Sequence, residues 1–180
     1  MATYAALLRG INLGSRNRVS MPDLRELFLA LGSEDVETYV QSGNVVFKSS
    51  ARSAKKLTAA IEERIAGDLG LEVTVILRTK AQLAKLLAGN PFAKGEKDPL
   101  KLHVTFLAAK PAAPRVRDLD SKYGGRDKFR VVGQDVYLHT PGGYGKSKLS
   151  NAYFERGLDV AATTRNWTTV TKLAELAAER

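Results

Sequence analysis

The stretch Thr38-Tyr39-Val40-Gln41-Ser42-Gly43-Asn44-Val45-Val46-Phe47 decides how the first half of this chain folds. Its two ends are rich in β-branched and aromatic residues, which favour extended strands. The polar residues between them include Gly43, which adopts turn geometry that other residues resist. We therefore predict a β-hairpin of two strands, residues 36–40 and 45–48.

Amphipathic helices are predicted on both sides of this hairpin, because large apolar residues recur there at helical spacing. Ser20, with Asp23 three residues later, resembles a capping box at the start of the first helix. Short apolar runs at residues 4–9 and 73–77 indicate two further strands. The helical positions are Leu24, Leu27, Phe28 and Leu31, then Leu57, Ile61 and Ile65, then Leu83, Leu86 and Leu87. The predicted order is βαββαβα.

The same order is predicted a second time after residues 89–100, a Gly-, Pro- and charge-rich segment that reads as a linker. The second set comprises strands at 102–106, 129–132, 136–139 and 160–164, a weak helix at 115–123 and a helix at 149–158. Asn166 is expected to cap a closing helix. We predict an α+β protein of two ferredoxin-like subdomains with antiparallel sheets, residues 1–88 and 101–180, related by duplication of element order.

Several short strings along the chain are together specific. They are Arg9-Gly10-Ile11-Asn12, Asn17 with Met21, the hairpin quoted above, Asn90-Pro91-Phe92, Ser147-Lys148-Leu149, and Thr163-Thr164-Arg165-Asn166-Trp167. On these strings the chain resembles the bacterial family filed as domain of unknown function 1697. The resemblance implies paired ferredoxin-like subdomains and no assigned activity. The family has a second glycine and then a lysine in its opening loop, where this chain has Ser15 and Arg16.

Composition narrows the classes of function. The 180 residues are 44% hydrophobic and 26% charged, and they contain no cysteine and two histidines. Disulfides, thiolate chemistry and a zinc site are therefore not expected, and neither a cofactor nor a metal is predicted. The start lacks a signal-peptide pattern and the apolar runs are short, so we expect a cytoplasmic protein without a membrane segment. The formal charge of +9 favours anionic partners, although it can also serve solubility alone.

The segment from Arg9 to Arg18 is the first candidate anion site. Arg9, Arg16 and Arg18 bring guanidinium groups, and Asn12 and Asn17 bring amides, to a loop that leads from a strand into a helix start. Guanidinium groups pair well with phosphate oxygens, and helix N-termini attract anions. A solvated basic turn is the alternative, because asparagine is a common turn residue.

A glycine-rich loop at 142–147 is the second candidate. The string Gly-Gly-Tyr-Gly-Lys-Ser suggests the phosphate-binding loop of nucleoside triphosphatases, but that motif needs a glycine where Thr140 stands. A looser phosphate site using Lys146, Ser147 and Lys148 stays open beside a plain flexible connector.

Two further sets of polar residues lie at predicted turns. Gln41, Ser42 and Asn44 at the hairpin tip can read a base edge, or they can simply shape the turn. Arg165 stands where a strand turns into the last helix, and it is a better ligand candidate than the neighbouring Asn166 and Trp167, which a helix cap and a core anchor explain.

The second sheet offers a possible stacking surface if one of its faces is open. Alternation predicts that one set of side chains faces the core, namely Leu102, Val104, Phe106, Val136 and Leu138. The opposite face would then carry His103, Thr105, Tyr137 and His139 as a basic, ring-bearing platform for bases.

These observations favour a binding protein for phosphate-bearing ligands, with nucleic acid, RNA or DNA, as the preferred class. No acid-base pair or activated nucleophile is complete, so an enzyme acting on a nucleotide or small phosphorylated metabolite is the alternative hypothesis. A protein-protein interaction module that pairs through a sheet edge is the third. The sequence does not rank oligomeric states.

Overall fold

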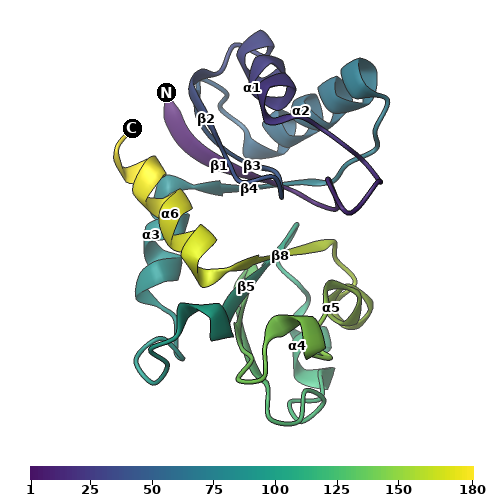
Figure 1. The fold of residues 1–180 in the computed structure, drawn as a ribbon, viewed down its shortest axis with the longest axis vertical. Coiled ribbons are helices and arrows are strands. Elements are labelled where there is room, and N and C mark those ends of the chain that lie inside the picture. The colour runs from purple at the N-terminus through teal and green to yellow at the C-terminus, as the bar shows by residue number, and fades with distance from the viewer. The chain divides into compact units, whose positions relative to one another are not determined.

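The computed structural model describes residues 1–180, which form two compact units. The first unit comprises residues 1–84 together with 173–180, and the second comprises residues 85–172. Figure 1 shows each unit as a sheet with helices. None of the helices combines the length and the apolar character needed to cross a lipid bilayer.

The first unit contains one four-stranded antiparallel sheet in the order β2-β3-β1-β4. The helices α1 and α2 cover one face of this sheet (Figure 1). Its elements are β1 (Ala2–Leu8), α1 (Met21–Ala30), β2 (Glu34–Tyr39), β3 (Asn44–Ser49), α2 (Ala54–Leu69), β4 (Val75–Thr79) and α3 (Lys80–Ala88), whose last residues belong to the second unit.

The second unit repeats the arrangement with sheet order β6-β7-β5-β8, also antiparallel throughout. Its elements are β5 (Leu102–Leu107), α4 (Ala113–Asp118), β6 (Lys128–Val132), β7 (Asp135–His139), α5 (Asn151–Leu158), β8 (Ala162–Asn166) and α6 (Trp167–Ala178), with 3-10 turns at Pro99–Lys101 and Tyr144–Lys146. The two four-stranded sheets confirm the predicted pair of ferredoxin-like halves.

Apolar side chains at the predicted helical positions form the core of the first unit. Leu24, Phe28 and Ile61 are fully buried, and the ring of Phe28 meets that of Phe47 edge-on at 4.9 Å. In the second unit Phe154 and Leu158 of α5 pack with β7 residues in the corresponding layer. Burial of these side chains supplies the main favourable free energy of each fold.

Strand registers reveal equivalent positions in the two units. Ala5 of β1 pairs with Arg78 of β4, and Val104 of β5 pairs with Arg165 of β8. Each arginine is buried, and each is followed by a residue that caps the next helix. The Thr79 hydroxyl accepts the Gln82 amide at 3.2 Å, and the Asn166 side-chain oxygen accepts the Thr169 amide at 2.8 Å. This shared arrangement supports the inferred duplication.

Candidate functional site

Two asparagines close the loop between β1 and α1. Asn12 and Asn17 both have left-handed backbone conformations, with φ of 53° and 48°, which asparagine tolerates better than most residues. The Asn12 backbone amide donates to the Asn17 carbonyl at 3.0 Å, and the Asn17 side-chain amide donates to the Gly10 carbonyl at 3.0 Å. The loop is therefore a fixed turn on which Arg16 is exposed to solvent.

The Asn12 side chain joins this loop to the hairpin and to the start of α1. Its Nδ2 donates to the carbonyls of Gln41 at 2.7 Å and Val19 at 3.0 Å, and its Oδ1 accepts the Val19 amide at 2.8 Å. Both Nδ2 hydrogens are thus used within the protein. Asn12 positions the site, while Arg16 and Arg18 present the exposed charge.

Gly43 allows the hairpin to approach the loop closely. Its φ is +85°, and a Cβ atom there would lie 2.5 Å from Cδ1 of Ile11. The buried Asn44 side chain donates to the Tyr39 carbonyl at 2.9 Å and to the Ser42 hydroxyl at 3.0 Å. Ser42 and Asn44 therefore shape the turn, and Gln41 is left as its exposed polar side chain.

A hollow of about 390 Å³ opens where the loop, the hairpin and the first turn of α1 meet. Ser20 caps α1 by accepting the Asp23 amide at 3.1 Å. Arg18 lies at the rim, with one guanidinium nitrogen 3.3 Å from the Gly14 carbonyl. The lining residues are Asn12, Arg18, Val19, Ser20, Met21, Pro22 and Gln41. Of the predicted residues of the first unit, Asn12, Arg18 and Gln41 line this hollow, beside a helix N-terminus that favours anions.

A larger hollow of about 520 Å³ lies elsewhere in the first unit, between α1, β2 and the end of α6. Four of its charged side chains, Arg25, Asp35, Glu37 and Arg180, form ion pairs within the protein. The Arg180 guanidinium contacts Glu37 and the Asp35 carbonyl, and Lys48 lies 2.6 Å from the Asp35 carboxylate and lowers its pKa. Arginines that are already paired with carboxylates are less available to an anion. The larger volume therefore does not make this hollow a better anion site than the one beside α1.

The glycine-rich loop of the second unit presents two exposed lysines. Lys146 ends the 3-10 turn, and Lys148 extends its Nζ to 5.9 Å from the ring centre of Tyr123. The Ser147 hydroxyl accepts the Leu149 amide at 3.1 Å, which ties the loop to the segment before α5. Lys146 and Lys148 therefore remain the solvent-facing cations of this segment.

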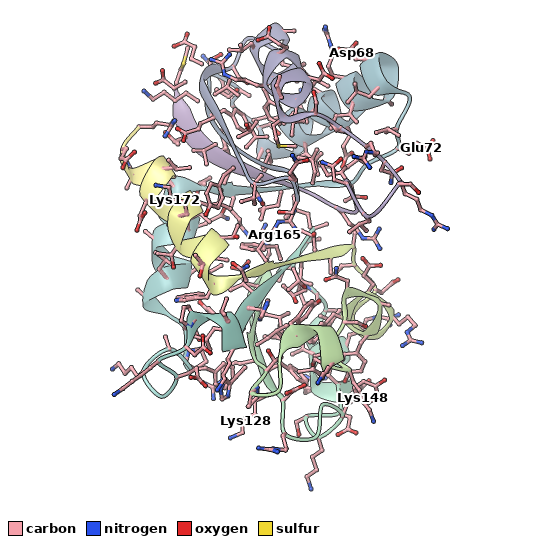
Figure 2. The ribbon with its side chains drawn as sticks, in the orientation of Figure 1. Asp68, Glu72, Lys128, Lys148, Arg165 and Lys172 are labelled. Carbon is pink, nitrogen blue, oxygen red and sulfur yellow. The ribbon has the colours of Figure 1, made fainter.

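Arg165 lies within the second unit's sheet and is only 7% exposed. It donates to the Thr163 hydroxyl at 2.7 Å and to the Thr164 carbonyl at 3.0 Å. Desolvation lowers its pKa to about 10. Figure 2 labels Arg165 at the β8 ribbon. Its burial and its equivalence to Arg78 favour a role in the fold over direct ligand contact.

The predicted stacking platform on the second sheet is wrong. The register pairs Val104 with Tyr137 and His103 with Leu138, so Tyr137 shares a face with Val104, while His103 shares one with Leu138. His103 and Tyr137 are also buried, at 8% and 3% exposure. Alternation along one strand is visible in a sequence, but a one-residue difference in register reverses which faces match.

Sequence reasoning missed the aromatic residues that are exposed or clustered near Lys148. Tyr123 follows α4, which ends at Asp118 instead of continuing to residue 123, and its ring stacks on Tyr153 of α5. The sequence did contain a signal for an exposed tyrosine at this place, because Tyr123 is flanked by Lys122, two glycines and Arg126.

Comparisons with known proteins identify relatives without a described activity. A family model described as "Protein of unknown function (DUF1697)" matches residues 1–137. A search of curated proteins finds no match. Among solved structures, the conserved bacterial protein SP0830 from Streptococcus pneumoniae is 25% identical, with a TM-score of 0.76 and 98% of each chain covered.

Proposed function

Because the chain belongs to the DUF1697 family of proteins of unknown function, its family supplies no activity, and we propose from the site itself that it binds phosphate-bearing ligands, with nucleic acid as the ligand class. The observation that carries this proposal is where the positive charge lies. The second unit has sixteen Lys and Arg against eight Asp and Glu, whereas the first has twelve against eleven.

Exposed cations are closely spaced in the second unit. Lys122, Arg126, Lys128 and Arg130 lie within nine residues, all exposed, with one acidic residue, Asp127, among them. A polyanion gains from such a surface because each neutralised phosphate releases counterions. A small anion would gain less from charges spread over a surface than from a few that converge on one pocket.

The first unit adds a local site to this surface charge. Arg18 lines the hollow at the N-terminus of α1, Arg16 is exposed in the same loop, and the Asn12 amide fixes that loop. A guanidinium group beside a helix N-terminus suits a phosphate group, and the second arginine of the loop adds positive charge nearby in the sequence.

The test is binding of labelled RNA, single-stranded DNA and duplex DNA across a salt series. The variant Arg16→Ala/Arg18→Ala removes charge from the loop that borders the hollow, and Lys146→Ala/Lys148→Ala removes it from the glycine-rich loop. The control Lys55→Ala/Lys56→Ala removes the same charge from exposed positions on α2. We expect both site variants to weaken binding more than the control does, with affinity that falls steeply as salt rises.

Absence of binding to every nucleic acid by the wild-type protein contradicts the choice of ligand class. Equal weakening in all three variants shows that only net charge matters, which removes the proposed sites. Arg165 is left unchanged in these variants because it is buried, and its replacement would disturb the fold.

The second candidate is an enzyme or binding protein for a nucleotide or small phosphorylated metabolite. The hollow of about 390 Å³ favours this reading, since it has the size of a small-molecule site. Saturable binding of a mononucleotide that is lost in Arg16→Ala/Arg18→Ala, with no binding of longer nucleic acid, would select it.

A further inference from the structure

Tyr123 is the one aromatic residue among the exposed large hydrophobic side chains of the protein. It is 39% exposed, and none of the other exposed large hydrophobic residues is aromatic. It follows α4 in the turn-rich segment before β6. A tyrosine ring that keeps this much of its surface in water is available for contact with a planar ligand.

The ring of Tyr123 is supported from below. It stacks on the ring of Tyr153 with centroids 4.2 Å apart and planes within 2° of parallel. Tyr153 in turn meets the rings of Phe129 and Phe154 edge-on, at 6.4 Å and 5.1 Å, and Phe154 is fully buried. The exposed ring is therefore the outer member of an aromatic column that reaches the core of the second unit.

Hydrogen bonds hold the column in place. The Tyr153 hydroxyl donates to the Asp120 carbonyl at 3.3 Å, and the Asp120 carboxylate accepts the Lys122 amide at 2.9 Å. Gly124 passes close to the chain around it, because a Cβ there would lie 2.9 Å from the Asp127 carbonyl oxygen. A ring fixed in this way loses little conformational entropy when a ligand stacks on it.

One cation lies over the exposed ring, and two more are close to it in the sequence. Lys148 Nζ lies 5.9 Å from the Tyr123 ring centre, and Lys122 and Arg126 are exposed within three residues of Tyr123. At 5.9 Å the ammonium is at the outer limit of a cation–π contact, and its flexible stem lets it move to a phosphate while a base takes the ring.

We propose that Tyr123 is a base-stacking platform for single-stranded nucleic acid, with Lys148 contacting the backbone phosphate beside the stacked base. This inference rests on the proposed function. It adds which surface of the protein binds the nucleic acid, and that the nucleic acid is single-stranded. Single strands are favoured because a duplex hides the faces of its bases, whereas an unpaired base offers its face to an aromatic ring. The excess of positive charge in the second unit complements the phosphates.

The experiment compares two labelled oligomers with the same number of phosphates, an oligothymidylate and an abasic oligomer, against the full-length protein. The variants are Tyr123→Ala, Tyr123→Phe and Lys148→Gln. We expect Tyr123→Ala to weaken oligothymidylate binding about tenfold or more, and to leave abasic binding and the salt slope unchanged. Tyr123→Phe should stay within about twofold of wild type, since the ring is retained. Lys148→Gln should reduce the salt slope by about one.

The outcomes separate this inference from the function on which it rests. If the wild-type protein binds both oligomers equally and Tyr123→Ala changes neither, the platform is excluded and the phosphate-binding proposal stands. If neither oligomer binds, both proposals fall. Tyr123→Phe and the comparison of the two oligomers on wild-type protein keep the test valid even if Tyr123→Ala unfolds, which near-UV circular dichroism would show.

Discussion

His103 is a buried polar side chain on a central strand of the second sheet. It is 8% exposed, its Nδ1 has no hydrogen-bond partner, and its ring stacks on Tyr144 with centroids 4.7 Å apart. The register places it opposite Asn166, as Tyr4 is placed opposite Thr79 in the first unit. Tyr4 stacks on Phe47 instead, so the duplicated position carries a ring in both units but an imidazole only in the second.

Replacing His103 should change how stability depends on pH. Burial lowers the pKa of His103 below its ordinary value of 6.5, so the unfolded chain takes up a proton before the folded protein does. Above about pH 6.5 the neutral His103 should therefore contribute fully to the free energy of unfolding of the wild-type protein. This contribution is lost as the pH falls through the pKa that His103 has in the folded protein.

His103→Phe keeps a ring and cannot titrate, so its stability should fall less than that of wild type below about pH 6.5. Urea denaturation at several pH values measures this difference. His139→Gln serves as the matched control, since these are the two histidines of the chain. Parallel pH profiles for wild type and His103→Phe would show that the imidazole does not titrate differently on folding.

Val40 adopts a backbone conformation that β-branched residues avoid. Its φ is +50°, and its side chain is 45% exposed at the hairpin tip beside Gln41. Strain of this kind costs of order 1 kcal/mol or more, and little burial offsets it here. Val40→Asn should raise the free energy of unfolding by about 1 kcal/mol, because asparagine tolerates left-handed φ.

Thermal denaturation checks this, with Val132→Asn as the control, since Val132 is equally exposed at 46% but lies in a strand. A loss of stability at Val40 as large as that at Val132 would mean that its backbone is not strained.

The helices and hairpins were predictable because their signals are local. Ser20 accepts the Asp23 amide and Asn166 accepts the Thr169 amide, as the capping patterns indicate. The hairpin at residues 39–44 was likewise visible from its glycine. The end of α4 at Asp118 was not visible, because nothing in the following residues stops a helix as strongly as proline.

Tertiary relationships limited what the sequence could say about the candidate site. Arg16, Arg18 and Gln41 could be identified as polar loop residues, but the Asn12 bond to the Gln41 carbonyl joins two loops 29 residues apart. Arg165 reads as a surface cation, and only the three-dimensional structure shows that it is buried. The strand register, which decides the faces of His103 and Tyr137, depends on pairings between distant segments.

Gly43 links the hairpin to the loop that carries the arginines. Gly43→Ala combines a left-handed φ of +85° with an approach of 2.5 Å to Ile11, and it should cost about 2–3 kcal/mol. Gly14→Ala, with φ of +60° and no atoms near the added methyl group, should cost about 1 kcal/mol.

Urea denaturation of both variants measures the difference, which isolates the contact with Ile11 from the backbone strain. Equal losses would mean that Ile11 moves aside freely and that the two segments are not tightly apposed.

The two units keep the same sheet order but differ in what covers the sheets. In the first unit α2 has 16 residues, whereas α5 in the second has 8 and follows a glycine-rich loop. Where the first unit has the longer helix, the second unit has loops, and these loops carry exposed lysines and the exposed Tyr123. The duplicated fold thus carries a compact, nearly neutral half and a strongly basic half, and the proposed binding surface uses the loops that distinguish them.

Residues 173–180 belong to the first unit although they are the last in the sequence. Arg180 lies 145 positions from Asp35, yet its Nε donates to the Asp35 carbonyl at 3.0 Å. It also donates to the Leu176 carbonyl at 2.7 Å and pairs with Glu37. The Lys80 ammonium donates to the Ala178 carbonyl at 3.0 Å. The first unit is therefore complete only when the final turn of α6 has packed.

Arg180→Ala should destabilise the first unit selectively, by about 1–2 kcal/mol, because its partly buried side chain bonds two backbone carbonyls and a carboxylate. Hydrogen exchange reads the two units separately, and faster exchange is expected at β1–β4 amides than in wild type, with β5–β8 unchanged. Glu179→Ala, an exposed neighbour, should leave both unchanged. A uniform loss of protection in all eight strands would instead show that the two units unfold as one cooperative body, so that the last turn of α6 stabilises the whole chain.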